Sequence, residues 1–120
     1  MSNIDDKMRI VQELVPGKQI TLAHIIANPD KVLYDKLGLE PSKDYSKCSI
    51  GILTVTPAET AIICADIATK SSGASLGFIE RNGGTLIITG SVSELESSFN
   101  SIAEYCRDVL GYEICNITKT

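Results

Sequence analysis

The segment from Ser49 to Lys70, SIGILTVTPAETAIICADIATK, contains a strand that is followed directly by a helix. The run SIGILTV at its start is mostly aliphatic, which is typical of a buried strand. Thr56, Pro57 and Glu59 then have the spacing of a helix start, with Thr56 as N-cap and Glu59 completing a capping box. The predicted helix presents small side chains on one face, Ala58, Ala61, Ala65 and Ala68. Because this segment holds no reactive group, it indicates close packing and assembly.

The composition is that of one ordinary globular domain. The chain has 120 residues, of which 43% are apolar and 22% are charged, and both length and composition fit a single domain. Its net charge is −4 at pH 7, and its lysines and arginines are not clustered. A surface that neutralises phosphate groups is therefore not expected, which argues against a nucleic-acid-binding protein.

The cysteines have neither the spacing of close pairs nor that of metal ligands; they are Cys48, Cys64, Cys106 and Cys115. We therefore expect all of them to be reduced thiols in a cytoplasmic protein. Cys64 and Cys106 lie on apolar helical faces, where a thiol behaves as a small hydrophobic side chain. The first residues lack the basic and apolar regions of a secretion signal, and no apolar run approaches the ~20 residues of a membrane span. We therefore expect a soluble, cytoplasmic protein with no membrane partner.

Two strands are predicted in the first part of the chain. Residues 8–15 alternate between two faces, and the Pro16-Gly17 turn signal separates them from the rest. Residues 19–26 form the second strand, and one of its faces carries Ile20, Leu22, His24 and Ile26.

A short helix is predicted after these strands. Asn28-Pro29 caps its start and Gly38 ends it, with Val32, Leu33 and Leu37 pointing inward. The polar residues 40–47 then form a loop before the strand that begins at Ser49.

The second half of the chain predicts a hairpin, a helix and a closing strand. The strands at 75–80 and 85–90 are joined by the turn Arg81, Asn82, Gly83 and Gly84, in which Asn-Gly is a hairpin signal. Ser93 opens the last helix with a capping box that extends to Glu96, and Gly111 ends it. The closing strand spans residues 112–118.

From Ser49 onward the predicted order is β-α-β-β-α-β, the ferredoxin-like arrangement of an α+β fold. Right-handed crossovers place both helices on one face of an antiparallel sheet. The strands, however, are apolar on both faces: Ile50 and Ile52 oppose Leu53 and Val55, and Leu86 and Ile88 oppose Ile87. The second face needs cover, which we expect in part from the preceding strand and helix and in part from another subunit.

Candidate catalytic groups are few and scattered. His24 is the single histidine, and in mid-strand a hydrogen-bonded structural role suits it better than that of a general base. Glu59 and Asp66 belong to one helix, and no partner carboxylate can be placed near them. No glycine opens a helix after a strand with phosphate-loop spacing. We therefore predict no catalytic residue, no cofactor, no metal ligand and no enzymatic activity.

Two basic residues leave alternatives open. Lys70, at the end of its helix, either stabilises the helix dipole or contacts another molecule. Arg81, in the hairpin turn, either binds an anion or is simply exposed.

Several segments together resemble one known family. They are VPGKQITLAH at 15–24, IGIL and TP at 50–53 and 56–57, ADIATK at 65–70, and ITK at 117–119. The chain resembles the bacterial microcompartment (BMC) shell proteins, in particular the circularly permuted single-domain type that includes the ethanolamine-utilisation S and propanediol-utilisation U shell subunits. The resemblance covers essentially residues 8–120.

The resemblance implies a cyclic homohexamer whose flat subunits tile the shell of a metabolic organelle in the cytoplasm. It implies an N-terminal extension, residues 1–16, followed by a permuted shell domain, residues 17–120. In the extension, one strand per subunit would form a six-stranded parallel β-barrel over the six-fold axis; its residues are Met8, Arg9, Ile10, Val11, Gln12, Glu13, Leu14 and Val15.

The resemblance also assigns contact residues, none of them catalytic. Lys70 matches the lysine at the edge between hexamers, and Lys119 falls where relatives carry a basic residue that joins this edge. The turn from Arg81 to Gly84 matches the hairpin that borders the central opening. It is shorter than in ordinary shell domains and lacks their glycine-serine-glycine sequence, which argues against a metabolite pore.

The implied partners are copies of the chain itself, other shell proteins and the encapsulated enzymes of an aldehyde-generating catabolic pathway of the propanediol, ethanolamine or choline type. A different class of function also fits the fold. Ferredoxin-like oligomers often bind effectors between subunits, so the alternative is a small-molecule-binding regulatory module.

Overall fold

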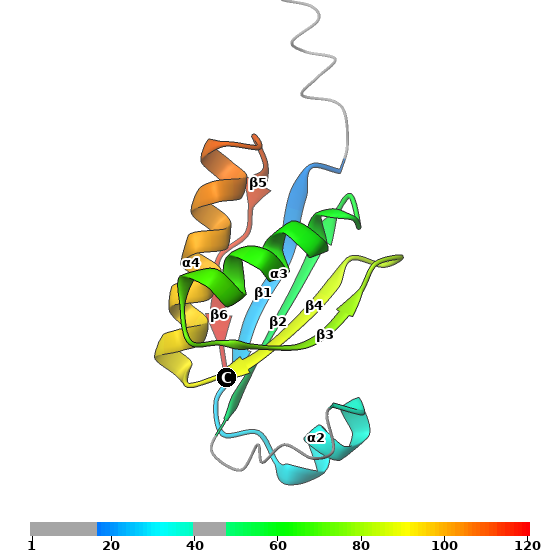
Figure 1. Ribbon diagram of the computed structural model, residues 1–120, viewed down its shortest axis with the longest axis vertical. Helices are drawn as coiled ribbons and strands as arrows, with labels where there is room; N and C mark the ends of the chain where they lie inside the picture. The colour runs from blue at the N-terminus through cyan, green and yellow to red at the C-terminus, as the bar shows by residue number, and fades with distance from the viewer. Residues whose placement is uncertain (1–16, 40–47) are drawn as a thin grey trace, which may run out of the picture.

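The structure is a computed structural model that describes residues 17–39 and 48–120. Within these residues the chain forms one sheet and three helices (Figure 1). The strands are β1 (Gln19–Ile26), β2 (Ser49–Thr56), β3 (Ser75–Glu80), β4 (Thr85–Gly90), β5 (Glu113–Ile114) and β6 (Thr118–Lys119). The helices are α2 (Lys31–Leu37), α3 (Thr60–Ser71) and α4 (Val92–Asp108). The predicted strand at 8–15 and loop at 40–47 lie outside the described residues.

The sheet has the order β3-β4-β2-β1-β5, and β6 also pairs with β1. Strand β2 pairs with β1 and β4 in antiparallel fashion, and β3 pairs with β4 in the same way. Strands β5 and β6 run parallel to β1. The prediction of an antiparallel sheet is therefore wrong at this edge, because β1 is inserted between the first and last strands of the β-α-β-β-α-β unit.

The predicted closing strand at 112–118 is interrupted. Its two pieces, β5 and β6, pair with β1 at Gln19–Ile20 and at His24–Ile25, and the gap lies opposite residues 21–23. Strand β1 has a register irregularity between Ile20 and Leu22 where it pairs with β2. A bulge of this kind interrupts the regular ladder, so a continuous partner strand cannot form there.

The same bulge corrects the prediction about the faces of β1. Ile20, Ala23 and Ile25 are buried in the core beneath the helices, whereas Leu22 is exposed. Ile26 packs in a second cluster on the opposite side of the sheet. Leu22, His24 and Ile26 share that opposite side, since they pair with Thr54, Ile52 and Ile50. The prediction is therefore wrong for Ile20, because the irregularity between Ile20 and Leu22 shifts the period-2 alternation.

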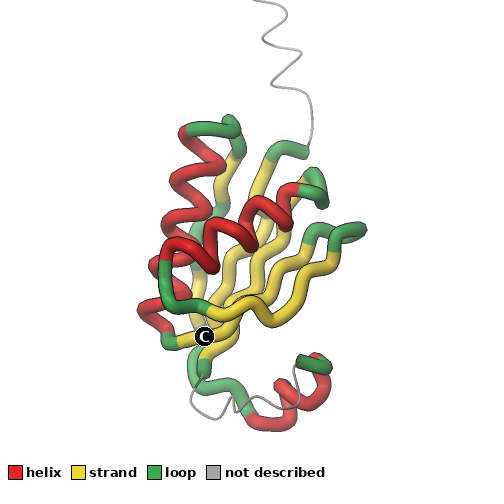
Figure 2. Tube along the Cα trace, in the orientation of Figure 1, coloured by secondary structure: helices red, strands yellow, loops and turns green. Residues whose placement is uncertain are grey.

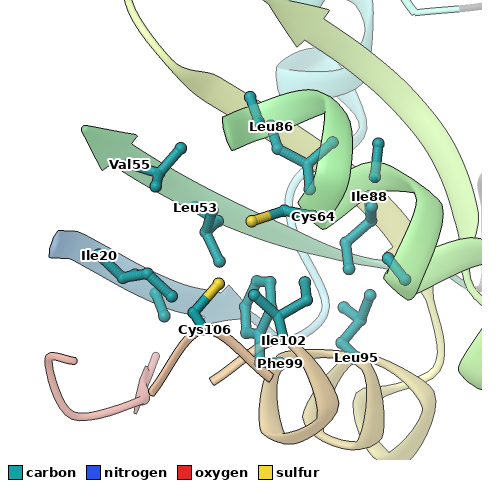
Figure 3. Packing of buried hydrophobic residues seen from close by; sticks show 14 of the residues in the cluster. Ile20, Leu53, Val55, Cys64, Leu86, Ile88, Leu95, Phe99, Ile102 and Cys106 are labelled. Atoms are coloured by element: carbon teal, nitrogen blue, oxygen red, sulfur yellow. The ribbon is translucent and has the colours of Figure 1, made fainter. Parts of the chain in front are cut away.

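Helices α3 and α4 lie side by side over one face of the sheet (Figures 1 and 2). As predicted, the small residues Ala61, Ala65 and Ala68 of α3 are buried. The prediction is wrong for Ala58, which precedes the helix and is only partly buried. The core between helices and sheet includes Leu53, Val55, Leu86, Ile88 and Phe99 (Figure 3). This packing of two helices on one sheet face accounts for the main hydrophobic core.

Both predicted capping boxes are wrong by a few residues. Helix α3 begins at Thr60 after a turn in which the Thr60 N–H donates to the Pro57 carbonyl at 3.0 Å. Thr56 cannot cap it, because Thr56 is the last residue of β2 and pairs with Gln19. Helix α4 is capped by Ser91 instead of Ser93, in a complete capping box with Glu94.

Helix α2 lies on the other side of the sheet from α3 and α4, towards one end of the strands (Figure 1). Its N-cap is Asp30, where Asn28-Pro29 was predicted, and Gly38 ends it as predicted, with φ 68°. Tyr34 is the buried residue of this helix, and Val32 is exposed, contrary to the prediction that Val32 points inward. Leu33 and Leu37 pack against the same cluster as Tyr34, as predicted.

The prediction of a sheet that is apolar on both faces is confirmed. Ile50 and Ile87 form a second buried cluster with Tyr34 and Leu39, separate from the main core. Leu22 and Phe78, however, remain 40% and 43% exposed. Helix α2 therefore covers only part of the second face.

Gly51 in the middle of β2 gives a test of this packing. A Cβ at this position would lie 2.9 Å from Phe99 Cζ and 3.1 Å from Ile88 Cγ1. We expect Gly51→Ala to lower the free energy of unfolding by roughly 1–3 kcal/mol through overpacking, measured by urea denaturation. Gly83→Ala is the control, since its Cβ would meet only the tip of the Glu80 side chain. Equal midpoints for the two variants would contradict the described packing.

Candidate assembly surfaces

The residues predicted to border the axis and those predicted to lie at the edge between hexamers are at opposite ends of α3. At the end that we call the hairpin end, the Val55 N–H donates to the Gly84 carbonyl at 2.9 Å, so the turn at 81–84 lies beside the end of β2. Arg81 and Asn82 line a small hollow there with residues near the start of α3, Ala58, Glu59 and Ile62. The 12 residues of α3 span about 18 Å to its other end.

The opposite end, which we call the lysine end, is where α3 finishes and α4 begins. Ser72 Oγ and Ser98 Oγ are joined by a hydrogen bond of 2.5 Å. Lys70 Nζ lies 3.0 Å from Asp66 Oδ2 in the last turns of α3, and Lys119 Nζ lies 2.7 Å from Glu96 Oε2 near the start of α4. The structure therefore brings Lys70 and Lys119 to the same end of the domain.

Both lysines remain available for contacts beyond the subunit. The Lys70 side chain is 75% exposed and that of Lys119 is 49% exposed. Exposed ion pairs of this kind contribute at most about 1 kcal/mol. The two lysines therefore do little to hold the fold together.

The turn at 81–84 is shaped by its last glycine. Gly84 has φ 77°, and a Cβ there would lie 2.2 Å from the Val55 carbonyl oxygen. Its N–H donates to the Glu80 carbonyl at 2.9 Å. The turn is therefore held against β2, while Arg81 on its outer side is exposed.

The described part of the chain also begins at the hairpin end. Gly17 lies against Thr56, since a Cβ at Gly17 would be 3.2 Å from Thr56 Cγ2. The predicted axial barrel strand, residues 8–15, lies outside the described residues. Gly17, where the described chain begins, is nevertheless at the same end as the turn at 81–84.

His24 has the hydrogen-bonded structural environment that was predicted for it. Its Nδ1 lies 2.6 Å from Thr118 Oγ1, and its Nε2 lies 3.0 Å from Thr120 Oγ1. The backbone of the same segment is also held, because the Thr120 N–H donates to the Ile25 carbonyl at 2.9 Å. His24 thus fastens β6 and the last residue to β1.

The cysteines are all free thiols. Cys64 of α3 and Cys106 of α4 are buried and turn their sulfur atoms toward each other in the core (Figure 3). Hydrogen bonding with Cys106 and burial together raise the pKa of the Cys64 thiol. Burial likewise raises the pKa of the half-buried Cys115 thiol. Both shifts disfavour the reactive thiolate.

Within residues 17–39 and 48–120, no three side chains of histidine, cysteine, aspartate or glutamate come together in a group that could hold a metal ion. Across the same residues, no helix has the length and hydrophobicity needed to span a membrane.

Two exposed flanks of the domain were missed by the sequence analysis. The first, which we call the β3 flank, consists of Leu76 and Phe78 on the edge strand and Arg81 in the turn. The second, which we call the α4 flank, is a groove between α4 and the β5–β6 segment, lined by Asn100, Ala103, Arg107 and residues 112–118. The polar Asn116 inside an apolar strand pattern was the one sequence signal for the interrupted strand that lines this groove.

A model of the BMC domain matches residues 49–118 of the chain. The chain is 46% identical over 112 residues to the bacterial microcompartment shell protein PduU of Salmonella typhimurium, covering 93% of each chain. It is 43% identical over 115 residues to the shell protein EutS of Escherichia coli, covering 96% of this chain and 99% of that relative. These relatives are structural shell proteins and not enzymes, in agreement with the prediction for this chain.

Among solved structures, the chain is similar to a "CutR flat hexamer", with 40% identity and a TM-score of 0.80 over 88% of this chain and 94% of that one. A second form of that hexamer gives a TM-score of 0.79. A "CutR dimer with domain swap" gives 0.61 at 38% identity, over 87% of this chain and 100% of that one.

The role of His24 can be tested by removing its ring. We expect His24→Ala to cost about 1–2 kcal/mol of unfolding free energy through the two lost hydrogen bonds, and to speed hydrogen exchange at the Thr120 amide. Thr21→Val is the control, because it removes a side-chain hydrogen bond to Thr54 and leaves β6 untouched. Unchanged exchange at Thr120 in the His24 variant would show that the ring does not fasten β6.

Proposed function

The chain belongs to the BMC-domain family of bacterial microcompartment shell proteins, and on this premise we propose that it assembles into cyclic hexamers that tile a shell. The observation that carries the proposal is the similarity to the flat CutR hexamer over 88% of the chain. The partly uncovered second face of the sheet also supports it, since exposed apolar surface favours association.

We propose that each subunit points its hairpin end to the six-fold axis and its lysine end to the rim. The residues that the resemblance assigned to the axis and to the rim lie at opposite ends of α3, which supports this orientation. Lys70 and Lys119 would then contact a neighbouring hexamer, and the turn at 81–84 would border the axis. Their high exposure is what such contacts require.

We further propose that residues 8–15 supply one strand of a β-barrel that caps the axis. Support comes from their alternating sequence and from Gly17, which lies at the hairpin end beside Thr56. The family model begins at Ser49, so β1 and α2 precede the matched region. This order supports the circular permutation that the sequence suggested.

The proposed location is the shell of a cytoplasmic bacterial microcompartment, with other shell proteins and encapsulated enzymes as partners. The relatives are named bacterial microcompartment shell proteins, which supports this location. The pathway that we propose is the one the sequence resemblance implies, an aldehyde-generating catabolic pathway of the propanediol, ethanolamine or choline type. The small-molecule-binding regulatory module has no comparable support in these comparisons and is not favoured.

The proposal predicts the mass and shape of the assembled protein. In native mass spectrometry the protein should appear at six times its subunit mass of 12.9 kDa, and electron micrographs should show six-fold tiles. A protein that remains a single copy at all concentrations would refute the proposal.

The rim assignment predicts a selective effect of Lys70→Ala. Because Lys70 makes one exposed ion pair within the subunit, its loss should change the unfolding free energy by less than about 1 kcal/mol and leave the hexamer intact. Two-dimensional sheets, scored by electron microscopy, should become scarcer. Lys18→Ala, at the hairpin end, is the control that should form sheets normally. Normal sheets from the Lys70 variant would refute the rim assignment.

The barrel assignment predicts the effect of deleting residues 1–15. The deletion should leave a six-copy ring with an open axis, seen as a central hole in averaged electron micrographs. Loss of the ring would instead identify this segment as an element of assembly.

A further inference from the structure

Helices α3 and α4 each place one cysteine in the core between them. Cys64 and Cys106 are both 0% exposed, and their sulfur atoms point toward each other (Figure 3). A single buried cysteine usually serves as a small apolar side chain. Two buried thiols that face each other can in addition be joined by a disulfide bond.

Hydrogen bonds hold α3 and α4 in register on either side of the cysteines. On one side, the hydroxyl groups of Thr60 and Tyr112 are hydrogen-bonded to each other. On the other side, Ser72 Oγ and Ser98 Oγ are 2.5 Å apart. In this series the residue numbers rise along α3 as they fall along α4, so the two helices run in opposite directions. The same register brings the two cysteines opposite each other, and the packing of both helices fixes their position.

The backbones of the two helices also lie close together, as a disulfide requires. Its two Cα atoms must be within about 7 Å of each other, whereas packed helices commonly have axes about 8–10 Å apart. Here the buried residues around Cys64 on α3 are small, Ala61, Ala65 and Ala68. Ser98 Oγ of α4 donates to the Ala68 carbonyl at 3.4 Å. A side chain as short as serine reaches that oxygen only because the two backbones lie close together.

The two thiols have different acidities because they share a hydrogen bond. This bond, together with burial, raises the pKa of the Cys64 thiol. The same bond lowers the pKa of the Cys106 thiol. Because the thiolate is the form that attacks an oxidant, Cys106 is the nucleophile of the pair. Cys64 is the thiol that completes the bond.

Cys106 lies near the end of α4, where local opening gives a small oxidant access to the core. The helix ends at Asp108, and the next residue, Val109, is 62% exposed. The groove of the α4 flank runs along the same turns, since Ala103 and Arg107 line it. The last turn of a helix opens more readily than its middle.

We propose that Cys64 and Cys106 are a reversible redox pair, which a peroxide oxidises to a disulfide that ties α3 to α4 within one subunit. The Cys106 thiolate attacks one oxygen of hydrogen peroxide, the O–O bond breaks, and the leaving hydroxide takes up the Cys106 proton to form water. Cys106 is then a sulfenic acid. The Cys64 sulfur attacks the Cys106 sulfur, the S–O bond breaks, and the hydroxyl group leaves with the Cys64 proton as a second water.

The two sulfur atoms thus lose two electrons in total, and the two peroxide oxygens gain them. A thiol reductant such as dithiothreitol reverses the reaction by exchange. The inference does not depend on the proposed hexamer, because both cysteines belong to one subunit.

A variant that keeps only this pair tests the proposal by intact mass. The double variant Cys48→Ala, Cys115→Ala removes the two other thiols, which are partly exposed. After treatment with hydrogen peroxide in the folded state, it should lose about 2 Da, the mass of two hydrogen atoms. It should run as a single subunit on a non-reducing denaturing gel and recover its mass with dithiothreitol. Adding Cys64→Ala gives the matched control, which should gain oxygen instead of losing hydrogen.

The wild-type protein gives a second readout that does not rely on any variant. After peroxide treatment, the remaining free thiols are alkylated and the protein is digested. Mass spectrometry should then find the peptides of Cys64 and Cys106 joined. The oxidised protein should have a Tm higher by roughly 5 °C or more, because a cross-link between these residues restricts the unfolded chain.

Two results would overturn the redox pair. The first is that both cysteines are recovered as separate alkylated or oxygenated residues after treatment in the folded state. The double variant oxidised in urea supplies the cross-linked standard, so a missing signal cannot be a failure of detection. The second is a disulfide that lowers Tm, which would show that the bond does not fit the folded core. Neither result would affect the proposed hexamer, whose test is the mass of the assembly.

Discussion

Strands β2 and β4 carry aliphatic side chains on both faces, so neither face of the sheet can be left in water without cost. The α3–α4 layer covers one face, where Leu53, Val55, Leu86 and Ile88 are buried. The other is covered by α2 only around Ile50 and Ile87. Burying the uncovered apolar area of this face against another copy would contribute about 25 cal/mol per Å², which favours association. Association is thus a consequence of the sheet composition.

The helices α3 and α4 approach each other closely because α3 carries small side chains on its buried face. Ala61, Ala65 and Ala68 are buried, and contacts such as that between Ser98 Oγ and the Ala68 carbonyl, at 3.4 Å, join α4 directly to the α3 backbone. The ends of α3 are then left for other contacts, with the turn at one end and Lys70 at the other. One helix thus sets the distance between the proposed axis and rim.

Local sequence patterns predicted the parts of the fold that depend on neighbours in the chain. The aliphatic runs predicted strands that are apolar on both faces, and the Asn-Gly turn predicted the hairpin at 81–84. The bulge of β1 could not, since neither glycine nor proline marks Thr21 and Leu22. The start of α3 was misplaced because Thr56 is held by pairing with Gln19, a distant residue. The two flanks depend on which strands become edges, and this order is decided by the whole sheet.

We infer that the subunit completes its apolar cover by binding copies of itself. Thermal unfolding measured over a hundredfold range of protein concentration tests it most directly, because a protein that is stabilised by association has a concentration-dependent midpoint. We expect Tm to rise steadily with subunit concentration. A Tm that is the same at every concentration would contradict it.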